Sequence, residues 1–138
     1  MPEGNVQLDR SPYEHTCMLN KTTTGSGEAL NVSEYKAVVV AIASASNYNG
    51  TVKCQGTIMQ IKPDWDSSSS ATNIWENLRM TRLMNSASIK GTDGVSASGS
   101  DFVTIYEIDT NGITYVNFDQ TARSAGNVSV YIRPYKNS

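Results

Sequence analysis

The chain has 138 residues, of which 11 are Lys or Arg and 13 are Asp or Glu, giving a formal net charge of -2. This length suits one domain with a sizeable buried core, so a disulfide framework is not needed for stability. Proteins that bind nucleic acid through its phosphates usually carry a basic surplus or a basic stripe. The basic residues here are a minority and are spread along the chain, which argues against nucleic acid as a partner.

The chain carries no pattern for secretion or membrane insertion. Its N-terminus, "MPEGNVQLDRSPYEH", lacks the basic and apolar segments of a signal peptide. The longest apolar run, residues 37–43, is far shorter than the ~20 residues that cross a bilayer. We therefore expect a protein that is made in the cytoplasm and has no membrane partner.

Residues 1–12 predict an extended N-terminal arm, because they contain two prolines and no apolar period. We expect a single domain over 13–138. It begins with a strand-like run over 13–24, after which "GSGEAL" at 25–30 predicts a turn.

An apolar segment over 35–45 predicts a central strand that is covered on both faces. Asn49-Gly50 follows and is typical of a two-residue hairpin turn. In the next strand apolar and polar residues alternate, and Cys54 falls on the apolar side. We expect Cys54 and Cys17 to be buried thiols, although the two could form a disulfide.

The middle of the chain is dominated by a loop and an ambiguous segment. Residues 62–73 contain a proline and four consecutive serines and predict a loop. In 74–84 the pair Asn73 and Glu76 is typical of a helix capping box, whereas apolar alternation favours a strand. We favour the strand, because most of the surrounding segments are β. Residues 85–100 predict turns with one short strand.

The last third predicts three strands, over 101–108, 113–122 and 128–135, with turns at "DTNG" and "SAGN" between them. This spacing is typical of an antiparallel meander. Seven or eight strands in all indicate an all-β protein, an antiparallel β-sandwich with jelly-roll or immunoglobulin-like layering.

Catalytic and metal-binding patterns are weak. His15 is the sole histidine, and with Cys17 it lacks the glycines of a nucleophile elbow. "EIDTNG" at 107–112 begins like a calcium loop, but Phe118 stands where that loop needs an acid, so a turn with Gly112 at positive φ is favoured. We expect no catalytic residue, no metal site and no cofactor.

Asp64, Trp65 and Asp66 form the most suggestive motif in the loop. A tryptophan flanked by carboxylates can stack on a sugar ring and accept hydrogen bonds from its hydroxyls. Alternatively, Trp65 folds back and caps one end of the sandwich, because large apolar rings rarely stay exposed. A glycosidase pair is disfavoured, since two acids so close in one loop do not flank a cleft.

Tyr131, Arg133 and Tyr135 share one face of the last strand, opposite Val128, Val130 and Ile132. Tyrosine and arginine dominate protein contact energies, so these three residues are candidates for a protein interface. Ordinary cross-strand pairing on a solvated sheet is the alternative.

The order "GSGEALNVSEYKAVVVAI … NGTVKCQGTI … KPDW … NGITYVNFDQTARSAGNVSVYIRP" resembles a group of small β-sandwich structural proteins of tailed bacteriophages. In that group an arginine often follows "YV", whereas here Tyr115-Val116 is followed by Asn117-Phe118. The resemblance covers roughly residues 25 to 135.

The resemblance implies a non-enzymatic virion component with no catalytic residues. It implies a capsid decoration protein that binds capsid subunits on the head surface and is itself a homo-oligomer. The alternative is a tail protein, or a receptor-binding or carbohydrate-binding module that uses the Asp64-Trp65-Asp66 loop.

Overall fold

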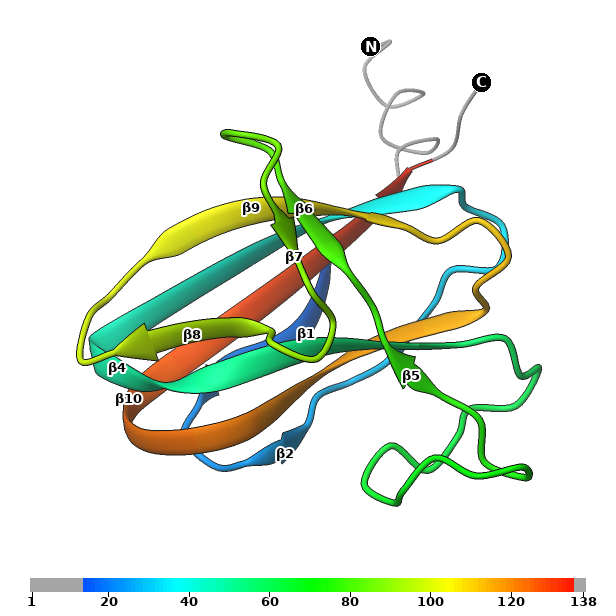
Figure 1. The fold of residues 1–138 in the computed structure, drawn as a ribbon, viewed down its shortest axis with the longest axis horizontal. Coiled ribbons are helices and arrows are strands. Elements are labelled where there is room, and N and C mark those ends of the chain that lie inside the picture. Colours follow the sequence, from blue (N-terminus) through cyan, green and yellow to red (C-terminus); the bar gives the residue numbers. More distant parts are fainter. Residues whose placement is uncertain (1–13, 136–138) are drawn as a thin grey trace, which may run out of the picture.

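The computed structural model describes residues 14–135, and all of their regular structure is β (Figure 1). Its ten strands are β1 (His15–Lys21), β2 (Gly25–Ser26), β3 (Leu30–Asn31), β4 (Ala37–Thr57), β5 (Glu76–Asn77), β6 (Met80–Arg82), β7 (Ser88–Ile89), β8 (Val95–Ser98), β9 (Val103–Asp109) and β10 (Tyr115–Tyr135). The predicted all-β class is confirmed. The number of strands exceeds the seven or eight predicted, because segments expected to be turns contribute short strands. The predicted arm over 1–12 lies outside the described residues.

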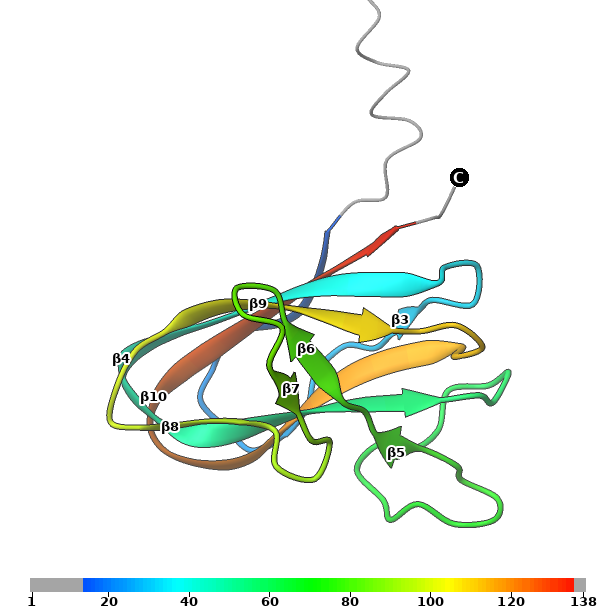
Figure 2. The ribbon, with the colours of Figure 1, turned by 45° about the horizontal axis from the view of Figure 1, so that its top comes forward.

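Two long strands, β4 and β10, organise the molecule. They pair antiparallel along their length, from Ala37 opposite Tyr135 to Thr57 opposite Tyr115. Both strands bend near their middle, so that the single sheet folds over itself into two layers (Figures 1 and 2). The first half of β4 and the second half of β10 form one layer with β1 and β9, and the remaining halves form the other.

The bend in β4 replaces the hairpin that Asn49-Gly50 predicted, and that prediction is wrong. Within β4 the residues with positive φ are Ser46 and Asn47, and the strand continues through Gly50, which pairs with Arg123 and Ala97. The type I′ hairpin turn that Asn-Gly favours needs positive φ at both of its central residues, and Asn49 and Gly50 do not have it. Gly50 serves close packing instead, because a Cβ there would come within 2.5 Å of the Tyr48 hydroxyl.

The predicted meander at the C-terminus is also wrong. "SAGN" at 124–127 lies inside β10 and causes register shifts against β4 rather than a chain reversal. β9 pairs with β4 and β6, so β9 and β10 are not neighbours. "DTNG" does form the predicted turn, with Gly112 at φ 91°, and it carries the chain from β9 to β10.

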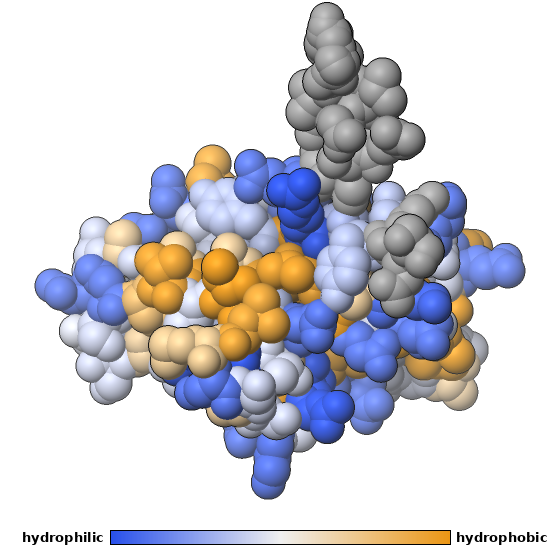
Figure 3. Space-filling model, turned by 90° about the horizontal axis from the view of Figure 1, so that it is seen from above, coloured by the Kyte–Doolittle hydropathy of each residue, from blue (hydrophilic) through white to orange (hydrophobic). Residues whose placement is uncertain are grey.

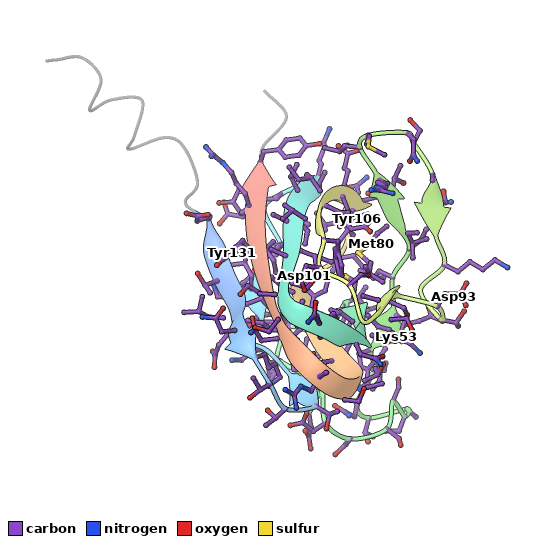
Figure 4. The ribbon with its side chains drawn as sticks, turned by 90° about the vertical axis from the view of Figure 1, so that its left-hand side faces the viewer. Lys53, Met80, Asp93, Asp101, Tyr106 and Tyr131 are labelled. Atoms are coloured by element: carbon purple, nitrogen blue, oxygen red, sulfur yellow. The ribbon has the colours of Figure 1, made fainter. Side chains whose placement is uncertain are left out.

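The core lies between the two layers. Val128, Val130 and Ile132 are fully buried, as the alternation of the last strand predicts. In Figure 4, Met80 and Tyr106 point into this interior, whereas Tyr131 lies on the outer side of β10 beside β1. The predicted strand character of 74–84 is confirmed by β5 and β6.

Cys17 and Cys54 are buried free thiols, as the sequence predicts. Burial raises the pKa of Cys17 to about 12 and the pKa of Cys54 well above its usual value. Both thiols therefore stay protonated in the folded protein at about pH 8.

We expect iodoacetamide to modify neither thiol in the native protein and both after unfolding in guanidinium chloride, as measured by intact mass. If the thiols of the native protein were alkylated as fast as those of the unfolded protein, the two cysteines would not be buried.

Candidate functional site

A groove beside the serine-rich loop is one candidate site, and the loop that walls it is held by its own polar groups. The Asp64 carboxylate accepts hydrogen bonds from the Asp66 N–H at 3.2 Å and the Ser67 hydroxyl at 2.6 Å. Asn73 does not cap a helix. Its side chain accepts from the Asp64 N–H at 2.8 Å and donates to the Asp64 carbonyl at 3.0 Å.

Both tryptophans of the chain line this groove. The rings of Trp65 and Trp75 lie 6.4 Å apart at 47°, and both side chains are half-buried. The Trp75 indole N–H donates to the Ser67 carbonyl at 3.1 Å, which fixes the orientation of that ring. The Trp65 indole N–H is buried and has no hydrogen-bond partner among the described residues.

The carboxylates of Asp66 and Asp119 also line the groove. Asp119 of β10 pairs with Ser26 of β2 and with Lys53 of β4, and the Ser26 hydroxyl donates to Asp66 at 2.8 Å. Burial, followed by the repulsion of Asp66, raises the pKa of Asp119 above its usual value. The tryptophan groove has a volume of about 390 Å³ and is lined by Thr24, Gly25, Trp65, Asp66, Ser67, Ser68, Trp75, Asp119, Gln120 and Thr121.

The structure separates the roles of the three residues in the predicted motif. Trp65 and Asp66 line the groove, whereas Asp64 stabilises the loop through both carboxylate oxygens. Sequence reasoning missed Trp75 and Asp119. Trp75 had a usable signal, as the second of only two tryptophans, but Asp119 reaches the groove through strand pairing that no local pattern reveals.

A second candidate surface covers the outer side of β9, β4 and β10. Residues directly opposite each other in antiparallel strands share a face. One row runs Ile105, Ala41, Tyr131, and the next runs Val103, Ala43, Ser129.

The hairpin of β6 and β7 extends this face, since the Leu83 N–H donates to the Ile105 carbonyl at 3.0 Å. The apolar face consists of Val39, Ala41, Ala43, Leu83, Val103, Ile105 and Tyr131.

Several side chains of the apolar face are strongly exposed. Val103 is 74% exposed, Leu83 51% and Ile105 45%. Figure 3 shows a hydrophobic patch on the side seen from above, which is the side of β4, β9 and the β6–β7 hairpin. The predicted central position of the 35–45 segment is confirmed, but its outer face is half-buried rather than covered.

Tyr131, Arg133 and Tyr135 lie on or beside the apolar face. Tyr131 lies at its β10 side opposite Ala41, and Arg133 is exposed opposite Val39. The Tyr135 hydroxyl donates to the Glu107 carboxylate, and this hydrogen bond is the main reason that the pKa of Tyr135 is raised. The three residues therefore form a charged and aromatic edge to an apolar surface.

Other candidates from the sequence have structural roles. A His15 ring nitrogen lies 2.8 Å from the Glu28 carbonyl, and the Cys17 thiol donates to Asn117, so the two side chains face different partners. Within residues 14–135 no group of three or more His, Cys, Asp or Glu is placed to hold a metal ion. No helix in this part of the chain is long and apolar enough to span a membrane.

No protein-family model and no curated protein sequence matches the chain. Among solved structures, the SPBc2 prophage-derived protein YomS superposes with a TM-score of 0.64 at 13% identity, covering 89% of this chain and 92% of YomS. The fold is shared with a prophage protein. The PBSX exported protein XepA superposes with a TM-score of 0.66, also at 13% identity, and this chain spans 37% of its length. The predicted resemblance to small phage β-proteins is thus confirmed for the fold.

Proposed function

We propose that this protein is a non-enzymatic structural protein of a bacteriophage particle, and that it decorates the head by binding capsid subunits. The observation that carries the proposal is the apolar face, which a rigid sheet displays in a molecule whose fold is shared with YomS. The likeness to YomS and XepA supports the phage association. The apolar face supports adhesion as the mode of action.

The chemistry of the face suits a protein partner. Contiguous exposed apolar surface that is rimmed by polar residues marks interaction sites. The centre of this face is aliphatic, with Tyr131 at its β10 side, while Arg133 and Glu107 lie along one edge. This arrangement of an apolar centre and a charged rim is typical of stable interfaces.

A capsid lattice presents one binding surface many times, so copies of the protein would lie near one another on the head. We propose that these copies contact each other and form a homo-oligomer there. The proposed location is accordingly the virion surface.

Head attachment can be measured directly. Purified protein is mixed with expanded heads of the phage that encodes it, and bound protein is counted after sedimentation. We expect saturable binding at a fixed number of copies per lattice site, and mass spectrometry should find the protein in separated heads. Its presence in tails and absence from heads would overturn the proposed placement, and turnover of a substrate by the purified chain would overturn the non-enzymatic role.

A further inference from the structure

The tryptophan groove shares no residue with the apolar face, so head attachment as proposed above leaves it unused. It lies where the loop after β4 meets β2 and the first half of β10, away from the side that carries β9 (Figure 1). Its volume of about 390 Å³ falls within the range of pockets that bind small molecules. A second binding function is therefore sterically available.

We propose that the tryptophan groove binds a neutral oligosaccharide. The two indole rings pack against the apolar C–H faces of sugar rings, and the two carboxylates accept hydrogen bonds from sugar hydroxyls. Half-buried aromatic rings with a few fixed polar groups are the usual composition of such sites. This function is additional to head attachment and does not depend on it.

The charges of the groove select against acidic sugars. Asp66 and Asp119 lie close enough for Asp66 to disfavour ionisation of Asp119. None of the described lining residues is basic. Lys21 and Lys53 lie close enough to Asp119 to favour its ionisation, but neither lines the groove. An anionic ligand would therefore meet repulsion, whereas hydroxyl groups would gain charge-assisted hydrogen bonds.

The recognition groups are already oriented before any ligand binds. The Asp66 carboxylate accepts a hydrogen bond from the Ser26 hydroxyl at 2.8 Å, and the Trp75 indole N–H donates to the Ser67 carbonyl at 3.1 Å. Asp119 of β10 pairs with Ser26 of β2 on one side and with Lys53 of β4 on the other, which fixes its backbone. Groups that are fixed in advance lose little conformational entropy on binding, which favours affinity.

Tryptophan fluorescence tests the proposal with unusual specificity, because the chain has two tryptophans and both line the groove. The probes are soluble neutral oligosaccharides of glucose, mannose, galactose and N-acetylglucosamine, with oligogalacturonate as the anionic probe. We expect at least one neutral probe to change the emission saturably at millimolar concentration or below, and oligogalacturonate to leave it unchanged. No response to any neutral probe, or stronger binding of oligogalacturonate, would overturn the proposal.

The affinities of two variants then show whether the oligosaccharide binds in the groove. Asp119→Asn keeps the shape of the side chain but removes the charge, and it should weaken binding about tenfold, since charge-assisted hydrogen bonds are roughly twice as strong as neutral ones. The matched control, Asp93→Asn, changes an exposed aspartate in the turn between β7 and β8 (Figure 4) and should bind like the unaltered protein. Equal affinities for Asp119→Asn and Asp93→Asn would show that the groove is not the binding site.

Trp75→Ala provides a second variant and is followed by calorimetry, because it removes one of the reporters. We expect at least a tenfold loss of affinity with an unchanged circular-dichroism spectrum. If Trp75→Ala disturbs the fold, Asp119→Asn still decides the question. Asp119→Asn should leave attachment to heads intact, so failure of the sugar site and failure of head decoration are distinguishable.

Discussion

Ile105→Asp should abolish attachment to phage heads while leaving the protein folded. Ile105 lies in the centre of the apolar face, opposite Ala41 and adjacent to Leu83, and 45% of it is exposed. Water solvates the new carboxylate in the free protein, so the free energy of unfolding should fall only by the lost partial burial and strand preference of isoleucine, about 1–2 kcal/mol. In the complex the same carboxylate would be buried without a partner, which costs several kcal/mol.

We therefore expect the affinity for heads to fall by at least about a hundredfold, equivalent to about 2.7 kcal/mol. The matched control is Ile61→Asp, which introduces the same charge at a residue that is 77% exposed and lies outside the apolar face. Bound copies per head are counted for both variants, and thermal unfolding is compared. Normal binding of Ile105→Asp would show that another surface attaches the protein.

Gly126→Ala should destabilise the fold by about 2–5 kcal/mol, because it adds a side chain at the bend of β10. Gly126 has φ 75°, a conformation that costs a residue with a side chain about 1–2 kcal/mol. A Cβ at this position would also lie 2.6 Å from both the Ala45 carbonyl oxygen and the Tyr48 Cα. Both contacts belong to the backbone of the paired strand β4, so relief requires β4 and β10 to move apart at the bend, at a further cost of about 1–3 kcal/mol.

Gly99→Ala separates the two contributions. Gly99 has nearly the same φ, 77°, but a Cβ there would have no atom within 4 Å. We expect this variant to lose only the conformational part, about 1–2 kcal/mol. Urea unfolding followed by tryptophan emission gives both values. Equal destabilisation by the two substitutions would mean that β4 and β10 do not pack tightly at the bend.

The destabilisation expected for Gly126→Ala is large because Gly126 packs against Tyr48, which connects several elements at the bend of β4 and β10. Tyr48 is fully buried, and its hydroxyl donates to Gln120 at 2.6 Å. Its N–H donates to Asp101 at 3.2 Å, and its carbonyl accepts from the Gly99 N–H at 2.9 Å. Tyr48 thus joins β4 to β10 and to the loop before β9, and displacement of Gly126 would disturb all three.

The amino-acid sequence by itself predicted features that depend on near neighbours. Alternation with a period of two identified the buried side of the last strand and the burial of Cys54, because successive strand residues point to opposite faces. The turn at Gly112 and the loop over 62–73 followed from glycine, proline and serine, whose backbone preferences are local.

The tertiary structure alone decided where the chain bends rather than reverses. Asn49-Gly50 and "SAGN" are compatible with either outcome, and long-range pairing of β4 with β10 selects continuous strands in both places. Pairing across the sheet also brought Asp119 to the tryptophans, and it placed Ile105 on the same face as Tyr131 with Ala41 between them. These arrangements depend on contacts between residues far apart in the chain, whereas sequence patterns report only what a segment prefers by itself.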